Sequence, residues 1–232
     1  MYTLQKASVY PMAFPNEAAD SYASLKFSQD SVTVAPSEHV VVDVVAIPPS
    51  GLDATRLALW SGYITVNGTD GSSLSMPYQG LSGSLRNSTV LASDQSWIFH
   101  SNYSKNYVKA PDNTTFLLPA AGDVLPAVYV GLALGSSQAK IDVVPMTTCP
   151  PKNPTTKAMG IKTIGQPFGF PSFWNSRGIS WWSWDGKLDS GRYAPAGNYQ
   201  FVTRALRTYG DENKNEDWDV AETQSFYIKD RN

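Results

Sequence analysis

The chain has 232 residues, of which 42% are hydrophobic and only 16% charged, and this composition is typical of a folded globular protein rather than a disordered one. A formal net charge of −2 gives no basic surface for nucleic acid or an anionic membrane. No apolar run approaches the ~18 residues of a membrane helix. We therefore expect neither a nucleic-acid nor a membrane partner, and the length allows one large domain or two ordinary ones.

The first third of the chain predicts short strands joined by tight turns. Residues 39–47 (HVVVDVVAI) are a β-branched run of strand length. The turn sequence NGTDG at 67–71 separates two strand-like runs, 63–66 and 74–78, and predicts a hairpin because Asn-Gly and Asp-Gly tolerate positive φ. Pro77 places the second run at a sheet edge or a strand end, since proline cannot donate to a ladder.

The rest of the chain predicts more strands and almost no helix. Residues 87–113 show little periodicity and are expected to form a long surface excursion. Residues 184–199 (WDGKLDSGRYAPAGNY) contain two Asp-containing glycine turns and are expected to fold the chain back without binding a ligand. The expected strands are 116–118, 127–134, 139–144, 199–207 and 224–228. This pattern predicts an all-β protein of two tandem β-sandwich domains, residues 1–86 and 87–232.

Four N-glycosylation sequons begin at Asn67, Asn87, Asn102 and Asn113. Such a density predicts a secreted glycoprotein. The start, MYTLQKASVY, lacks the basic and apolar regions of a signal peptide, so we expect the chain to be an internal or C-terminal piece of a longer protein. Cys149 is the only cysteine, and no disulfide can form within the chain.

The sequence does not assemble a catalytic motif. The two histidines, His39 and His100, have no second His or Cys at zinc-ligand spacing. The serine-rich stretch 71–77 faintly echoes the nucleophile segment of subtilisin-like proteases, but it lacks the Gly-Thr-Ser order and lies in a hairpin arm. We therefore expect this chain to be non-catalytic and to need no cofactor.

An acidic stretch near the C-terminus has the spacing of a calcium loop. Oxygen-bearing side chains fall at positions 1, 3, 5, 7, 9 and 12 of such a loop: Asp211, Asn213, Asn215, Asp217, Asp219 and Glu222. Glu216 stands where the loop requires glycine, and the flanks are strand-like rather than helical. These departures favour a solvated polar connection between strands and leave calcium as the alternative.

Four tryptophans lie close together in the sequence, at Trp174, Trp181, Trp182 and Trp184. Aromatic faces stack on sugar rings, so the cluster is a candidate carbohydrate platform, but clustered rings are also the usual material of a core. Alternation along a strand sends Trp182 and Trp184 to one face and Trp181 to the other. At least one ring should therefore be buried.

Three segments, in order, resemble a known family: LWSGYITVNGTDGSSLSMPYQGLSGS (59–84), VYVGLALGSSQAKIDVVP (128–145) and a third segment that begins WDGKLDSGRYAPAGNYQF (184–229). They are similar to the C-terminal region of large secreted fungal subtilisin-like serine proteases, which contains the fibronectin-III-like domain shared with C5a peptidases. The resemblance extends from about Leu25 to the end of the chain.

The resemblance implies immunoglobulin/fibronectin-III-like sandwiches in a secreted, glycosylated protease whose catalytic Asp, His and Ser precede Met1. No catalytic residue is carried over to this chain, because none of the family's catalytic motifs is present. The implied role is to support the missing protease domain and to shape access for its protein substrates. The acidic 211–222 stretch then resembles a connection between strands rather than a metal loop. Two alternatives remain: a carbohydrate-binding module of a secreted enzyme, and a stand-alone extracellular interaction protein.

Overall fold

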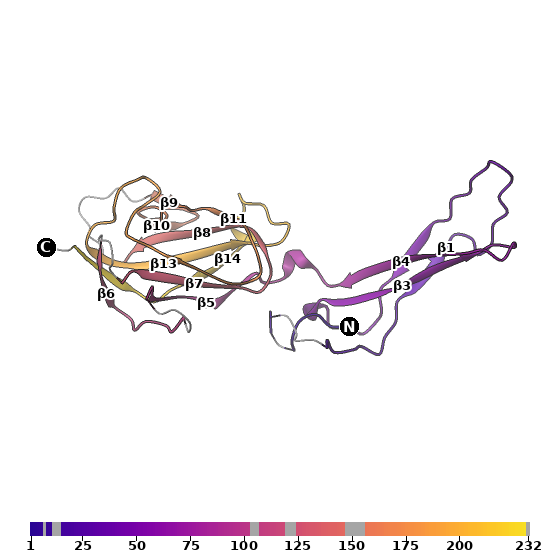
Figure 1. Cartoon of the computed structure of the whole chain (residues 1–232), viewed down its shortest axis with the longest axis horizontal. Coiled ribbons are helices and arrows are strands. Elements are labelled where there is room, and N and C mark those ends of the chain that lie inside the picture. Colours follow the sequence, from indigo (N-terminus) through magenta and orange to yellow (C-terminus); the bar gives the residue numbers. More distant parts are fainter. Residues whose placement is uncertain (7, 11–14, 103–106, 119–123, 147–155, 231–232) are drawn as a thin grey trace. The chain divides into compact units, whose positions relative to one another are not determined.

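The computed structural model describes residues 1–6, 8–10, 15–102, 107–118, 124–146 and 156–230. These residues form strands with only short 3-10 turns, and the chain divides into two compact units, Met1–Leu85 and Arg86–Asn232 (Figure 1). The predicted all-β fold class is confirmed, whereas the number of sandwich domains stays a prediction. In the described part of the chain, no helix has the length and apolarity needed to cross a membrane.

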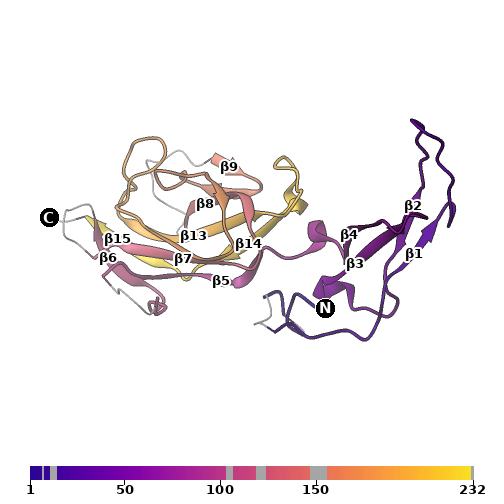
Figure 2. The ribbon, with the colours of Figure 1, turned by 45° about the vertical axis from the view of Figure 1, so that its right-hand side comes forward.

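The first unit contains two separate antiparallel ladders (Figure 2). β1 (Ser24–Phe27) pairs with β2 (Val44–Ile47), and β3 (Ala58–Asn67) pairs with β4 (Ser73–Ser82). The second ladder confirms the predicted hairpin, with an unbroken register from Ala58↔Ser82 to Asn67↔Ser73. A single 3-10 turn, η1 (Ala54–Arg56), precedes β3 and is capped by the Asp53 carboxylate.

The strand expected over 39–47 forms only from Val44 onward. The ladder with β1 ends at Phe27↔Val44. At the next position the Ser28 amide still donates to the Asp43 carbonyl at 2.9 Å, but the Asp43 amide donates to the Ser28 hydroxyl at 3.0 Å, so a side chain replaces one of the two backbone bonds there. Sequence periodicity continued past this point because a β-branched run does not reveal where its partner strand stops.

The second unit is a sandwich of two sheets with a separate two-stranded ladder. Its elements are η2 (Leu85–Asn87), β5 (Leu91–His100), β6 (Thr114–Leu118), β7 (Pro126–Leu132), β8 (Ser136–Pro145), β9 (Thr156–Ala158), β10 (Ile161–Thr163), β11 (Ser172–Asn175), β12 (Gly178–Ser183), β13 (Gly197–Leu206), η3 (Asn215–Asp217), β14 (Trp218–Glu222) and β15 (Phe226–Asp230). A three-stranded sheet has the order β12-β7-β5, and a six-stranded sheet has the order β11-β8-β13-β15-β6, with β14 also paired to β13. β9 and β10 form the separate ladder. β15 and β6 run parallel, and the other pairs are antiparallel.

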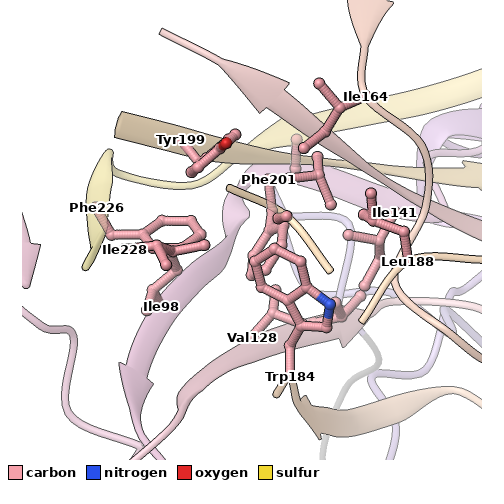
Figure 3. Packing of buried hydrophobic residues seen from close by; sticks show 14 of the residues in the cluster. Ile98, Val128, Ile141, Ile164, Trp184, Leu188, Tyr199, Phe201, Phe226 and Ile228 are labelled. Atoms are coloured by element: carbon pink, nitrogen blue, oxygen red, sulfur yellow. The ribbon is translucent and has the colours of Figure 1, made fainter. Parts of the chain in front are cut away.

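The core of this sandwich lies between the two sheets (Figure 3). Val128 from the three-stranded sheet meets Ile141, Phe201 and Phe226 from the six-stranded sheet, and all four side chains are buried. Trp184 is also buried here, with its ring edge-on to Phe201 at 5.2 Å between centroids. Its indole N–H donates to the carbonyl of Lys187 at 2.7 Å, so the one polar atom of the buried ring has a hydrogen-bond partner.

Tyr199 fixes the start of β13. The ring is buried, and its hydroxyl donates to the carbonyl of Pro195, four residues upstream, at 2.8 Å. This is the arrangement of the tyrosine corner of immunoglobulin-like sandwiches. Burial raises the pKa of Tyr199 to about 12, because the phenolate would lose its hydration.

The expected excursion at 87–113 is wrong in its first half, which forms β5. Polar side chains that follow β13 bind the outer edge of this strand and make it part of the sandwich. Asp219 accepts from the amides of Val90 and Leu91 at 2.5 and 3.1 Å. Gln224 accepts from the Ile98 amide at 3.0 Å and donates to the Ile98 carbonyl at 2.7 Å. We call Asp219 and Gln224 the polar seam.

Candidate functional site

The structure does not bring the four clustered tryptophans onto one face. Trp184 is buried in the core, and Trp182 is half-buried against it. Trp181, 47% exposed, projects from the opposite face of β12, as alternation predicts, and meets Phe99 edge-on at 6.0 Å. Trp174, 84% exposed, lies on β11 of the other sheet. Only two of the four rings are therefore open to a ligand, and they belong to different sheets.

Trp174 has an unusual backbone. Its φ is +56°, and it is left unpaired between Phe173↔Gln138 and Asn175↔Ser136, so it interrupts the pairing of an edge strand without shifting the register. A bulky side chain at positive φ is strained. The Ser172 hydroxyl donates to the Asn175 side-chain oxygen at 2.9 Å, and this contact spans the unpaired residue.

The carboxylates of the 211–222 stretch bind protein donors rather than converging on one point. Asp217 accepts from the Asp211 amide at 2.8 Å and from Arg86 at 2.9 Å. The Asp211 amide, and after it the Arg86 charge, lower the pKa of Asp217. Asp219 belongs to the polar seam and also accepts from Arg207 at 2.7 Å.

Asp211 is exposed and accepts from the amide of Asn213, and this hydrogen bond lowers the pKa of Asp211. In the described residues, no group of three or more His, Cys, Asp or Glu side chains is placed to hold a metal ion. The connection is less solvated than expected, because Asp217 and Asp219 are both buried.

All four sequon asparagines are exposed. Asn67 ends β3, where its side-chain oxygen accepts from the Ser73 hydroxyl at 2.9 Å, and Asn113 accepts from the Ser225 hydroxyl at 3.0 Å. The second and third residues of the Asn102 sequon, and Cys149, lie outside the described residues. His39 is exposed in the first unit, and His100 ends β5 in the second, beside the ring of Phe116.

One face of the β3–β4 ladder is apolar along its whole length. Directly opposed residues share a face, so the register places Trp60, Ile64, Val66, Leu74, Met76 and Tyr78 on the same side. We call these six residues the ladder face. Val66, Leu74 and Met76 are 61%, 74% and 59% exposed, so the end of this side next to the hairpin turn is not covered by the rest of the described chain, whereas Trp60, Ile64 and Tyr78 are half-buried. Neither strand contains a charged residue.

Two glycines let the aromatic rings of the ladder face lie flat across the strands. A Cβ at Gly80 would stand 2.0 Å from the nearest ring atom of Trp60, and one at Gly62 would stand 2.4 Å from the Tyr78 hydroxyl. Each ring therefore occupies the space above the glycine opposite it. The two rings thus fill the space that side chains at the glycines would occupy, and no gap is left on the ladder face at these positions.

Arg56 anchors the N-terminal residues beside this ladder. Its side chain is buried, donates to the Leu4 carbonyl at 3.1 Å, and pairs with Glu17 at 2.8 Å. The guanidinium also lies over the Tyr2 ring, 3.9 Å from its centroid. Glu17 raises the pKa of Arg56, so the cation persists at any physiological pH. These contacts hold Met1 against the start of β3.

Sequence alternation predicted the hairpin but not the ladder face. Its signal was present, because the even-numbered positions of both strands, apart from Ser82, are apolar or glycine. The side chains on the other face, such as Tyr63 and Leu81, are also partly apolar, so the pattern did not distinguish an inner from an outer side.

Comparison with known families bears on this same unit. Residues 2–79 match the Fn3-like domain family. The matched residues contain both ladders and the anchored N-terminus, so the ladder face belongs to an Fn3-like region. No curated protein matches the chain. An all-β region of this kind is typically non-catalytic, in line with the absence of a catalytic motif from the sequence.

Proposed function

We propose that the chain is the non-catalytic C-terminal β-sandwich region of a secreted, glycosylated subtilisin-like serine endopeptidase of fungal type. It supports the catalytic domain, which precedes Met1, and shapes access for protein substrates. The support comes from the Fn3-like match at 2–79 together with the three segments that resemble such proteases. The support for an extracellular location comes from the four exposed sequons.

The observation that carries the supporting role is the uncovered end of the ladder face. Soluble monomers rarely expose a contiguous apolar patch of more than a few hundred Å², and larger ones mark interaction sites. An isolated two-stranded hairpin is also only marginally stable in water. A neighbouring domain packed on Leu74, Met76 and Val66 removes both costs.

The first test is the reading frame ahead of the Met1 codon, which should encode the Asp, His and Ser motifs of a subtilisin-like domain. In that full-length protease, Met76→Lys should lower the temperature of irreversible inactivation. Thr65→Lys, on the opposite face of the same ladder, is the matched control and should change it little. A frame without a protease domain contradicts the proposal.

The non-catalytic assignment has its own test. The isolated chain, incubated with casein and a serine-directed fluorophosphonate probe, should neither cleave the substrate nor become labelled. Specific labelling of any serine in the chain would overturn the assignment.

A carbohydrate-binding module is the second candidate, and the strained, exposed Trp174 favours it. The supporting role predicts no retention of the chain on chitin or β-glucan. Retention that Trp174→Ala abolishes, and that Trp181→Ala leaves intact, would instead assign a sugar-binding site to the exposed ring on β11.

A further inference from the structure

The N-terminus already forms the first rung of a third strand beside β3. The Met1 amino group donates to the Leu59 carbonyl at 2.9 Å, and the Leu59 amide donates to the Met1 carbonyl at 2.8 Å. Such a reciprocal pair is the hydrogen-bonded pair of an antiparallel ladder. The pairing continues towards the start of β3, where the Thr3 and Leu4 amides both donate to the Arg56 carbonyl.

This rung fixes which backbone groups of β3 point away from β4. In a strand, the N–H and C=O of one residue point to the same side, and alternate residues share that side. Because Leu59 points outward, Ser61, Tyr63 and Thr65 point outward too. Their amides and carbonyls have no hydrogen-bond partner within the described chain, and Tyr63 is 73% exposed.

Within the described residues, the β3 edge has none of the usual protections against pairing with another strand. Natural proteins protect an exposed strand edge with lysine, proline, a bulge or a covering segment. β3 contains no proline and no charged residue, and its register with β4 has no bulge. A ten-residue strand with one occupied rung and an open, uncharged remainder is therefore prepared to accept another strand.

We propose that the outer edge of β3 accepts one further antiparallel strand, supplied by the residues joined directly ahead of Met1 in the longer protein. The inference rests on the proposed function, which provides that upstream segment. Each step back from Met1 advances one residue along β3, so the residue two places ahead of Met1 lies opposite Ser61. The residue four places ahead of Met1 lies opposite Tyr63.

The side chains of this strand follow from the two faces of the ladder. Residues opposite Trp60, Gly62 and Ile64 extend the ladder face and should be apolar. Those opposite Ser61 and Thr65 lie on the other face and should be polar. A covalently joined segment enters in register at the Met1 rung, whereas a free peptide must also lose translational and rotational freedom to bind. The geometry thus favours the chain's own upstream residues over a separate peptide.

Amide hydrogen exchange, followed by NMR on the whole 232-residue chain, tests the proposal. One version carries about eight added residues ahead of Met1, alternating Thr and Val with Val next to Met1, which is enough to reach the end of β3. The exchange of the Ser61, Tyr63 and Thr65 amides should slow at least about tenfold relative to the unextended chain. The Trp60, Gly62 and Ile64 amides, which already face β4, should be unchanged and serve as internal controls.

The matched control carries an extension of the same length with proline in place of each Thr, so that the residues opposite Ser61, Tyr63 and Thr65 have no N–H to donate to the carbonyls of the edge. It should leave all six amides as they are in the unextended chain. Equal slowing with both extensions, or with neither, overturns the proposal. So does concentration-dependent slowing in the unextended chain with a dimer in sedimentation, because the edge then binds a second copy. The measurement needs no protease, so its outcome is independent of whether the upstream frame encodes one.

Discussion

Gln224 tests how the two sheets of the second unit are held together. Its side chain acts as a substitute peptide group on the free edge of β5: it accepts from the Ile98 amide and donates to the carbonyls of Ile98 and Ala110, at 3.0, 2.7 and 2.8 Å. The residue is buried, so water cannot replace these bonds. Gln224→Met keeps the length of the side chain and removes all three hydrogen bonds.

The cost of this substitution can be worked out from the groups that remain. The Ile98 carbonyl keeps a partner, because the Ala110 amide donates to it at 2.8 Å. The Ile98 amide and the Ala110 carbonyl are left buried without one. Each buried group without a partner costs about 1–3 kcal/mol, so the two together should cost roughly 2–6 kcal/mol. With a urea m-value of about 2–3 kcal/mol/M, the unfolding midpoint of this unit falls by about 1 M or more.

The assay is urea unfolding followed by tryptophan fluorescence, which reports the exposure of the buried Trp184. The chemically matched control is Gln79→Met, at an exposed position of β4. The control should change stability by no more than about 0.5 kcal/mol. A Gln224→Met midpoint equal to that of the control would refute the argument that the polar seam closes this sandwich. Hydrogen exchange at the Ile98 amide, which should accelerate in the variant, locates the effect.

Four further outcomes are expected. The pKa of Tyr199 is about 12 in the folded chain and about 10 in the unfolded chain, so the protonated phenol stabilises the fold below about pH 10. This contribution of roughly 2–3 kcal/mol is lost as the pH rises towards 12, because the unfolded chain releases the proton first. In urea melts at alkaline pH, Tyr199→Phe should lose less stability with rising pH than the unmodified chain. Phe201→Ala, which opens a cavity beside Trp184, should cost roughly 3–5 kcal/mol in the same melts. Met76→Lys in the isolated chain should change stability by less than about 0.5 kcal/mol, and a larger loss would show that the ladder face is covered within this chain. In a secretory host, Asn113→Gln should remove one glycan from the intact mass, and an unchanged mass would show that this sequon is not used.

Local signals in the sequence were reliable where the chain pairs with its near neighbours. The Asn-Gly and Asp-Gly turns predicted the β3–β4 hairpin, which joins residues adjacent in sequence. The fold-back at 184–199 is confirmed by the bridge between Lys187 and Tyr193. Alternation placed Trp182 and Trp181 on opposite faces of β12, as the structure does. In each case the deciding contact lies within a few residues of the pattern.

Sequence patterns were misleading where a polar side chain forms its hydrogen bonds with a distant part of the chain. β5 contains Ser93-Asp94-Gln95-Ser96, which is typical of a surface loop, yet Ser96 is buried and shares a hydrogen bond with Thr203 at 2.9 Å. Asp219 likewise has the sequence context of a solvated turn and binds two amides of the β5 segment. No local pattern distinguishes a polar side chain that faces water from one that caps a strand more than 100 residues away.

The two edges of the β3–β4 ladder differ in how readily they can pair with a further strand. Opposed residues in an antiparallel pair both point inward or both point outward, so Pro77, opposite the outward-pointing Tyr63, has its backbone nitrogen on the free side of β4. A proline there costs the ladder nothing and denies a donor to any strand that approaches from that side. The β3 edge has no such block and already carries the Met1 rung. The ladder therefore extends more readily past β3 than past β4, where Pro77 interrupts the row of outward amides.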